Sequence, residues 1–418
     1  MKSADPAGQA KLRILIVTQY FWPENFQINH IVRALIERGH RVTVLTGKPN
    51  YPLGDFYEGY SMFGRSLDSF EGCKVVRVPL VARGSASGFR LALNYPSFLV
   101  TASLLGPRRV RDPFDCIFVY APSPVIVGIP AIAVRGRRNI PIVYWMQDLW
   151  PESIEIASGI RSPILIGLLR RTIGLMLRRC ERVLIQSRAF RIHARQFGVD
   201  DQRIIYWPQS ADRIFQPAPP SDEVPDAFRS KDFRIMFAGN IANAQDFETV
   251  VKAADLLRDE EVRWIIVGDG RRREWVIEEV QRRGLEQRVF LPGRFPEQTM
   301  PGLFAHADAL LVTLAKEPIF SWTIPTKVQA YLASGKPIVA ALDGEGARII
   351  EDANAGVVAP AGDAAALASA VMKLASMSPS ARAELGANGL DYSRCNFDRD
   401  MLVDQLVGVF REAVQERR

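Results

Sequence analysis

The segment whose residue types best suit chemistry runs from Glu317 to Ala341. A polar loop ending in Lys327 opens an apolar stretch with helical spacing, which breaks at Gly335 before a buried strand. A helix start presents free backbone N–H groups, and the lysine adds a positive charge, so this arrangement suits a phosphate or diphosphate. The alternative is an ordinary loop–helix–strand unit in which Lys327 is only solvated.

The patterns of histidine and cysteine do not indicate a metal or disulfide site. The four cysteines lie far apart without a CxxC spacing, and the four histidines are scattered. A reducing cytoplasm is the expected compartment, and no metal or other cofactor is expected.

The net charge of +7 is unevenly distributed. Residues 1–213 hold 29 Lys/Arg against 16 Asp/Glu, whereas the remainder holds 24 against 30. A nucleic-acid binder would be basic throughout, and no such binding motif is present. A basic first half favours an anionic membrane surface or a lipid-diphosphate acceptor as partner.

No apolar run reaches the ~18–20 residues that cross a bilayer. Ile164–Ile185 mixes aliphatic residues with arginines, which is typical of a helix lying in a membrane interface. Phe89–Leu105, followed by arginines, is a second candidate. The alternative is an amphipathic helix packed on its own sheet. Peripheral association with the inner face of the plasma membrane is expected.

Both halves begin with the same strand–helix–strand pattern, at Leu12–Val17 and at Phe233–Ala238. Strands that alternate with helices imply parallel sheets covered on both faces, so the fold class is α/β with two doubly wound, Rossmann-like domains. The expected organisation is a loose tail at 1–10, an N-terminal domain at 11–207, a proline-rich linker at 208–232, a second domain at 233–392, and a helical segment at 393–418 returning to the first domain.

Six short segments, taken together in this order, carry a family resemblance. They are Gln19–Glu24, Lys48–Pro52, Asp148–Ser153, Ala238–Ile241, Val267–Gly270, and Pro325–Lys327 with Gly335–Pro337. Over about Leu12 to Phe410 the chain resembles the retaining glycosyltransferases of the large sequence family numbered four. It is similar to the branch that adds sugars, often deoxy-amino sugars, in colanic acid, O-antigen and capsule assembly.

The resemblance implies the GT-B architecture, in which two facing nucleotide-fold domains enclose the donor cleft, and a metal-independent, retaining transfer. The catalytic residues it implies are Asp148, Lys327 and Glu317. The donor-binding residues are Gly239, Asn240, Gln245, Gly268, Arg294, Phe295, Ile324, Pro325, Thr326 and Gln329. The acceptor-binding residues are Glu24, Asn25, Asn50, Tyr51 and Glu152.

The chain departs from the family at its pair of glutamates eight residues apart, where Trp322 and Ala330 stand instead. Glu317 is expected to replace the first glutamate from a longer loop, and Gln329 the ribose contact.

The family's basic pair after the first strand of the second domain is also missing, and Asn240 and Gln245 occupy those places. Lys327 and Arg294, with the backbone amides around Gly239, are therefore expected to neutralise the diphosphate.

Asp148 stands where the family often has a histidine near the reacting carbon. The expected role of Asp148 is to bind a hydroxyl of the acceptor or of the sugar. The alternative role is that of a general base. A helix N-cap ahead of Leu149 is the structural alternative.

The function expected is transfer of a sugar from a nucleotide-diphosphate donor to a polyprenyl-diphosphate-linked saccharide in surface polysaccharide biosynthesis. The resemblance favours a UDP-linked N-acetylated sugar, such as N-acetylfucosamine or N-acetylglucosamine, with GDP-fucose as the alternative donor. Two other functions remain open: a nucleotide-sugar 2-epimerase of the same fold, and an inactive sugar-nucleotide-binding scaffold.

Overall fold

The computed structural model describes residues 10–84, 88–154 and 162–417, and the chain divides into two compact units. The first unit joins the residues up to Trp207 to the C-terminal stretch Asp400–Arg418, and the second is Pro208–Arg399. The tail expected at 1–10 lies outside the described residues except for Ala10.

The first unit is built on an eight-stranded sheet in the order β3-β4-β2-β1-β5-β6-β7-β8. β3 pairs antiparallel with β4, and the other neighbours pair parallel. The strands are β1 (Arg13–Val17), β2 (Arg41–Thr46), β3 (Leu67–Phe70), β4 (Cys73–Arg77), β5 (Cys116–Ala121), β6 (Ile142–Met146), β7 (Arg182–Ile185) and β8 (Ile204–Tyr206).

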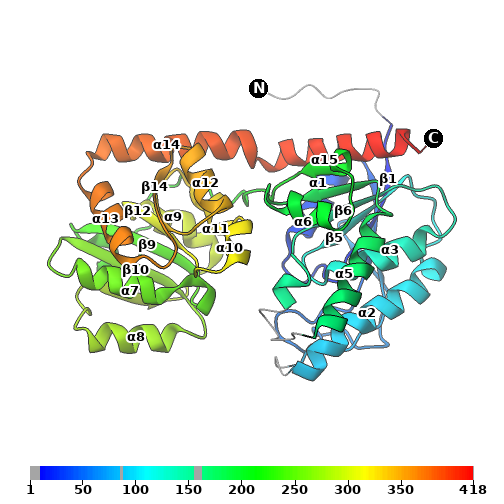
Figure 1. Cartoon of the computed structure of the whole chain (residues 1–418), viewed down its shortest axis with the longest axis horizontal. Coiled ribbons are helices and arrows are strands. Elements are labelled where there is room, and N and C mark those ends of the chain that lie inside the picture. Colours follow the sequence, from blue (N-terminus) through cyan, green and yellow to red (C-terminus); the bar gives the residue numbers. More distant parts are fainter. Residues whose placement is uncertain (1–9, 85–87, 155–161, 418) are drawn as a thin grey trace. The chain divides into compact units, whose positions relative to one another are not determined.

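Helices cover this sheet, and the last helix of the chain is one of them (Figure 1). The helices are α1 (Gln27–Glu37), α2 (Gly88–Arg109), α3 (Gly128–Arg135), α5 (Pro163–Leu177), α6 (Phe190–Gln196) and α15 (Arg399–Gln415). The apolar stripe of α15 is buried in the same core as α1, and the ring of Phe410 lies 5.5 Å from that of Phe118. Trp207 donates from Nε1 to the carbonyl of Leu402 at 2.8 Å, which fixes the start of α15.

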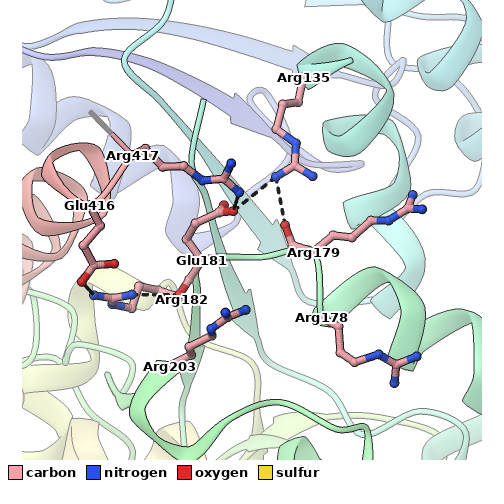
Figure 2. Close-up of a pocket in the computed structure, with 8 residues that line it drawn as sticks. All are labelled: Arg135, Arg178, Arg179, Glu181, Arg182, Arg203, Glu416 and Arg417. Carbon is pink, nitrogen blue, oxygen red and sulfur yellow. Dashed lines mark hydrogen bonds and ion pairs between the residues drawn. The ribbon is translucent and has the colours of Figure 1, made fainter. Parts of the chain in front are cut away.

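Ion pairs fix the other end of α15. Arg417 pairs with Glu181, and Glu416 pairs with Arg182, the first residue of β7 (Figure 2). The C-terminal helix is therefore anchored to the first unit along its whole length.

The second unit contains a six-stranded sheet in the order β11-β10-β9-β12-β13-β14, with all neighbours parallel. The strands are β9 (Phe233–Asn240), β10 (Val262–Asp269), β11 (Val289–Gly293), β12 (Ala309–Thr313), β13 (Ile338–Ala341) and β14 (Gly356–Ala359).

Two apolar cores lie on opposite faces of this sheet. α7, α8 and α13 contribute to one core, and α9, α11 and α12 contribute to the other. The helices are α7 (Phe247–Leu256), α8 (Arg273–Arg282), α9 (Met300–Ala305), α10 (Pro318–Trp322), α11 (Thr326–Ala333), α12 (Glu345–Asp352), α13 (Ala364–Ala375) and α14 (Pro379–Asn396).

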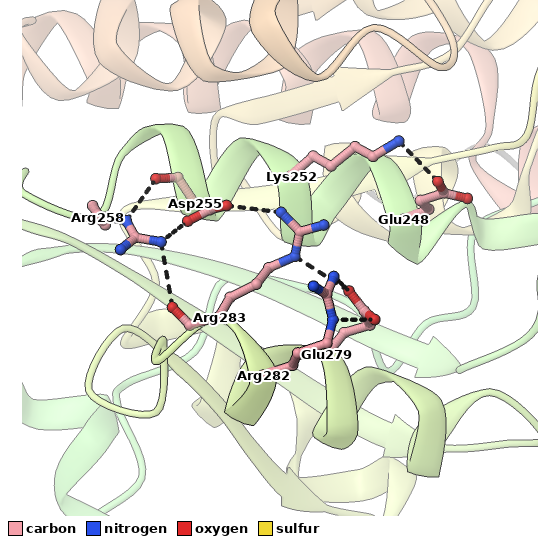
Figure 3. Close-up of polar contacts among 7 residues, drawn as sticks. All are labelled: Glu248, Lys252, Asp255, Arg258, Glu279, Arg282 and Arg283. Atoms are coloured by element: carbon pink, nitrogen blue, oxygen red, sulfur yellow. Dashed lines mark hydrogen bonds and ion pairs between the residues drawn. The ribbon is translucent and has the colours of Figure 1, made fainter.

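A network of charged side chains ties α7 to α8 on their outer surface (Figure 3). Arg283 donates to Asp255 of α7 at 2.7 Å and to Glu279 of α8 at 3.2 Å. Arg282 and Arg283 lower the pKa of Glu279 to about 2 through hydrogen bonds and charge. The network holds together two helices whose preceding loops lie at the carboxyl edge of the sheet.

The α/β fold with two doubly wound domains, predicted from sequence, is confirmed. The segment 208–232, expected as a linker, belongs to the second unit, where it contains a short 3-10 helix with Phe228 buried. The arginine-rich stretch Ile164–Ile185 is not one helix, because α5 ends at Leu177 and β7 begins at Arg182.

Candidate functional site

The carboxyl edge of the second sheet brings three glycine-containing strand ends side by side. Gly239 of β9 pairs with Gly268 of β10, and Val267 pairs with Gly293 of β11. Ligands of doubly wound sheets bind beyond this edge. The predicted donor residues Gly239, Gly268 and Arg294 therefore come from three adjacent strands.

Glycine is required where these strand ends approach each other. A Cβ on Gly268 would stand 1.9 Å from the carbonyl oxygen of Gly239, and its φ of +136° disfavours any other residue. The backbone at this edge is therefore open on one side and close-packed on the other, as close approach of a ligand to main-chain N–H groups requires.

Lys327 meets this glycine edge from the first turn of α11. Its Nζ donates to Oε1 of Gln245 at 2.8 Å and lies 4.7 Å from the ring centre of Phe237. A Cβ on Gly239 would stand 2.6 Å from Cε of Lys327, so the lysine stem lies directly against the glycine. Lys327, predicted as catalytic, is thus brought together with Gly239 and Gln245, which were predicted to bind the donor.

Burial lowers the pKa of Lys327 to about 8. The ammonium is therefore still charged at neutral pH, and in the part of the chain that the structure describes it makes one hydrogen bond. A buried cation with unused N–H donors is suited to stabilising an anion, because the low local dielectric strengthens its field.

The loop that presents Gln245 is held by the neighbouring strand. Thr313, at the end of β12, donates from its hydroxyl to the carbonyl of Gln245 at 2.5 Å, and Ala315 donates its N–H to Ala244 at 2.9 Å. Asp246 follows in a left-handed conformation and caps α7 through its contact with the Thr249 N–H. The partner of Lys327 is therefore positioned from two sides.

Several other predicted site residues lie on the same edge. The predicted donor residues Asn240, Arg294 and Thr326 are exposed, and so is Glu317, predicted as catalytic, which precedes α10. Phe295 is half-buried, with its ring 6.1 Å from that of Phe228.

The remaining donor predictions are packed into the protein. Ile324 is buried, Pro325 is half-buried at the start of α11, and Gln329 is only 2% exposed. Gln329 donates from Nε2 to the carbonyl of Gln209 at 2.8 Å. Its amide therefore positions the segment after β8 in this structure, and the ribose contact remains a prediction.

In the first unit, Glu24 joins the loops that follow β1 and β2. One carboxylate oxygen accepts from the N–H groups of Asn50 and Tyr51, both at 2.8 Å, and the other accepts from Phe21 at 3.0 Å. The residue is 1% exposed, and burial raises its pKa to about 7 although these hydrogen bonds lower it. Glu24 is a positioning residue here, rather than one whose carboxylate faces a ligand.

Asn50, also predicted to bind the acceptor, is fully buried in a polar network. Its Oδ1 accepts from the Arg83 N–H at 3.2 Å and from Asn94 at 3.3 Å. Asn94 in turn accepts from Nε2 of Gln19 at 2.6 Å. Asn25, by contrast, is exposed.

Above this network lies an aromatic surface that sequence reasoning identified only through Tyr51. The rings of Tyr20 and Phe26 stack at 5.0 Å, and Tyr51 lies 5.2 Å from Phe26 and is 37% exposed. The guanidinium of Arg83 lies 5.1 Å from the Tyr51 ring and donates to the Tyr20 hydroxyl at 2.7 Å. Aromatic faces beside a cation suit a saccharide carrying an anionic group.

Asp148 follows β6 at the same carboxyl edge of the first sheet. Its oxygens accept from the Leu149 N–H at 2.8 Å and from Nε1 of Trp150 at 3.1 Å. Burial raises its pKa, against hydrogen bonds from Ser153, Leu149 and Trp150 that lower it. A raised pKa makes this half-buried carboxylate a stronger base, which suits it to accepting a proton from a hydroxyl.

Glu152 lies four residues further and pairs with Arg170 of α5 at 2.8 Å. Its second oxygen is buried and makes no hydrogen bond among the described residues. The predicted acceptor residue thus links the Asp148 loop to α5 through one oxygen, and acceptor binding by Glu152 remains a prediction.

Within the described ranges, no group of three His, Cys, Asp or Glu side chains is placed to hold a metal ion. The free cysteines include three buried ones, Cys73, Cys116 and Cys180, and one exposed one, Cys395.

Two family models match the chain, one in each half. Residues 25–209 match the family described as glycosyl transferase 4-like domain, and residues 232–377 match the family described as glycosyl transferases group 1. This chain belongs to the glycosyltransferases. The predicted family is thus confirmed at this level, and the retaining, amino-sugar branch stays a prediction.

Known relatives agree with this assignment. A glycosyl transferase of Escherichia coli, WcaI, named for colanic acid biosynthesis, is 27% identical over 343 residues, which cover 78% of this chain and 82% of that protein. Among solved structures, sucrose-phosphate synthase from Thermosynechococcus elongatus superposes with a TM-score of 0.72 at 16% identity over 96% of this chain and 99% of that one. Anabaena HepE in complex with UDP superposes with a TM-score of 0.67 at 16% identity, over 96% of this chain and 100% of that one. These likenesses establish the GT-B fold.

Proposed function

We propose that this glycosyltransferase moves a sugar from a nucleotide-diphosphate donor to a lipid-linked saccharide, with retention and without a metal, in surface polysaccharide biosynthesis. The observation that carries the proposal is the cluster of Lys327, Gln245 and Gly239 at the carboxyl edge of the second sheet. A charged, half-buried ammonium beside the exposed backbone of Gly239 fits the diphosphate of the donor.

In this proposal the bond between the anomeric carbon and the diphosphate oxygen breaks as a new bond forms to an acceptor hydroxyl oxygen. Lys327 and the N–H groups around Gly239 stabilise the negative charge that develops on the leaving diphosphate. The proton of the acceptor hydroxyl passes to Asp148 or to the leaving diphosphate, and attack occurs on the face from which the nucleotide departs.

A UDP-linked donor is supported by a structural neighbour, because HepE is described in complex with UDP. A N-acetylated amino sugar is the proposed sugar, in keeping with the sequence resemblance. Glu317, Arg294 and Asn240 are exposed on the edge where the donor would lie.

The lipid-linked acceptor is supported by the surface of the first unit and by the colanic acid name of one relative. On α5, Ile164 is 85% exposed and Leu168 60% exposed, beside the exposed Arg170 and Arg171. On α2, Val100 and Leu104 are also exposed, and the helix ends in arginines. No helix in the described residues is long and apolar enough to cross a membrane. We infer peripheral binding of these helices to the cytoplasmic face of an anionic membrane.

An acceptor-dependence assay tests the proposal. The chain is incubated with UDP-N-acetylglucosamine and related donors, with and without a polyprenyl-diphosphate-linked saccharide, and released UDP and sugar products are measured in excess chelator. Release of UDP and formation of the new glycoside are expected only when acceptor is present. Conversion of the donor sugar without acceptor would identify an epimerase, and binding without either reaction would identify a scaffold. Complete loss of activity in chelator, restored by Mg²⁺ or Mn²⁺, would contradict the metal-independent mechanism.

A further inference from the structure

A cavity rich in arginine opens on the first unit at the amino ends of β7 and β8 (Figure 2). Arg182 is the first residue of β7, and Arg203 immediately precedes β8. The Asp148 loop follows the carboxyl end of β6, so the cavity and this loop lie at opposite edges of the same sheet. The cavity volume of about 490 Å³ is typical of a small-molecule site.

The charges that line this cavity do not balance. Six arginines and two glutamates surround it, which leaves four positive charges in excess. Both carboxylates are already engaged: Glu181 accepts from Arg135 and Arg417, and Glu416 pairs with Arg182. No lining carboxylate is left over for the other arginines.

Three lining arginines make no ion pair with a carboxylate in the part of the chain that the structure describes, although the pKa of Glu416 is lowered by its hydrogen bond with Arg182 and also by the charge of Arg203. Arg178 donates to the carbonyl of Phe197 at 2.9 Å, which uses one of its N–H groups. The side chains of Arg179 and Arg203 make no hydrogen bond or ion pair with a described residue, and both residues are exposed. Guanidinium groups gathered in one cavity repel each other unless an anion lies among them.

We propose that this cavity binds a phosphate-bearing anion with at least two negative charges, such as a phosphomonoester or a diphosphate, through Arg179, Arg203 and Arg178. The planar guanidinium presents paired N–H donors that match phosphate oxygens, which is why arginine predominates in such sites. The site is separate from the candidate donor site, which lies in the second unit. Its phosphate comes either from a soluble metabolite or from a phospholipid headgroup.

Anchoring of α15 does not account for this cavity. Glu181 and Glu416 anchor the C-terminal end through three arginines, and that role would be complete without Arg178, Arg179 and Arg203. The latter three come from the segment after α5 and from the residue that precedes β8, which are distant in sequence. All three line the same cavity, and a bound anion would account for that shared placement.

The test is calorimetric titration of the full chain with inorganic pyrophosphate. The double variant Arg179→Gln/Arg203→Gln is compared with Arg111→Gln/Arg394→Gln, which removes the same charge from two exposed positions that do not line the cavity. Lys327→Ala is included because pyrophosphate also fits the candidate donor site. The cavity variant should weaken one binding event tenfold or more, whereas Lys327→Ala should leave that event unchanged.

Equal affinity of the cavity variant and its charge-matched control would overturn the proposal, as would loss of all pyrophosphate binding in Lys327→Ala. If the cavity variant does not fold, hydrogen exchange of the unaltered chain decides: pyrophosphate should protect the amides of 178–182 and 201–204, and no protection would overturn the proposal. Glycerol phosphate and vesicles containing phosphatidic acid then distinguish the two sources. Binding of either one through Arg179 and Arg203 supports the site, and binding of neither rejects it.

Discussion

Gln245 accepts a hydrogen bond from the half-buried ammonium of Lys327 at 2.8 Å, although the two residues are 82 positions apart in sequence. Gln245 is neutral, so it orients the ammonium without neutralising it. The positive charge therefore remains available to a ligand at the carboxyl edge of the sheet, where Gly239 removes the side chain that would block approach. This relationship explains how the chain can do without the family's basic pair.

The affinity for UDP should fall as the pH rises through about 8. Burial lowers the pKa of Lys327 to about 8, and only the protonated ammonium attracts the diphosphate, so the dissociation constant should rise up to tenfold per pH unit above that value. The Lys327→Arg variant, whose guanidinium stays charged, should show no such rise. Calorimetric titration between pH 7 and 10 checks this, and an identical pH profile in the two proteins would exclude Lys327 as the diphosphate contact.

Glu24→Ala should lower the free energy of unfolding by roughly 2–4 kcal/mol, because three buried backbone N–H groups lose their acceptor. Glu24→Gln should lose less, since its carbonyl oxygen can still accept from Asn50 and Tyr51. Because burial raises the folded-state pKa of Glu24 to about 7, its contribution to stability is complete below pH 4.5 and declines up to pH 7. That pH dependence should be absent in Glu24→Gln. Urea unfolding of both variants measures these free energies. Equal stability of Glu24→Ala and Glu24→Gln would contradict the proposed role of the Glu24 oxygens as hydrogen-bond acceptors.

Gly268→Ala should destabilise the second unit by about 3 kcal/mol or more and abolish UDP binding. The new Cβ would lie 1.9 Å from the carbonyl oxygen of Gly239, at a φ of +136°. Gly284→Ala is the matched control, because its φ is also positive, at +64°, but no atom lies within 4 Å. Gly284→Ala should lower the free energy of unfolding by only ~1 kcal/mol, because alanine disfavours the left-handed backbone conformation. Thermal unfolding with and without UDP measures both effects, and a Gly268 variant that binds UDP normally would disprove the close-approach argument.

Replacing an exposed leucine of α5 should weaken binding to anionic vesicles. Leu168→Gln removes a side chain that is 60% exposed beside Arg170 and Arg171, so the partition coefficient should fall about tenfold. Leu256→Gln, 61% exposed on α7, should have no effect. Vesicle co-sedimentation at low and physiological salt gives the comparison, and an equal effect of the two substitutions would argue against α5 as the membrane contact.

Sequence patterns located most of the strand ends that form the candidate site. The strand predicted at Leu12–Val17 is β1 at Arg13–Val17, and the strand predicted at Phe233–Ala238 is β9, which extends to Asn240. Such local elements follow from apolar spacing and from glycine at their ends. Lys327 was identifiable because its loop opens a helix and its chemistry suits a phosphate.

Long-range contacts were beyond the reach of sequence patterns. The burial of Glu24 depends on N–H groups 26 and 27 residues further along the chain, and no local periodicity encodes that pairing. Arg83 lies outside every segment singled out in the sequence, and Asn94 lies in Phe89–Leu105, whose pattern indicated only an amphipathic helix, although both residues shape the loop around Asn50. Likewise, Arg179 falls in the stretch expected at a membrane interface and Arg203 falls in no predicted motif, and only the fold places both at one cavity.

The turnover of Lys327→Ala at saturating donor tests the central claim most directly. Loss of one preorganised charge contact to the departing diphosphate should lower turnover by roughly 10²–10³-fold. The fold should stay intact, because the substitution removes a buried charge that is held by a single hydrogen bond among the described residues. Lys327→Arg should retain more activity than Lys327→Ala. Near-normal turnover of Lys327→Ala at saturating donor would show that the diphosphate binds elsewhere and would contradict the account.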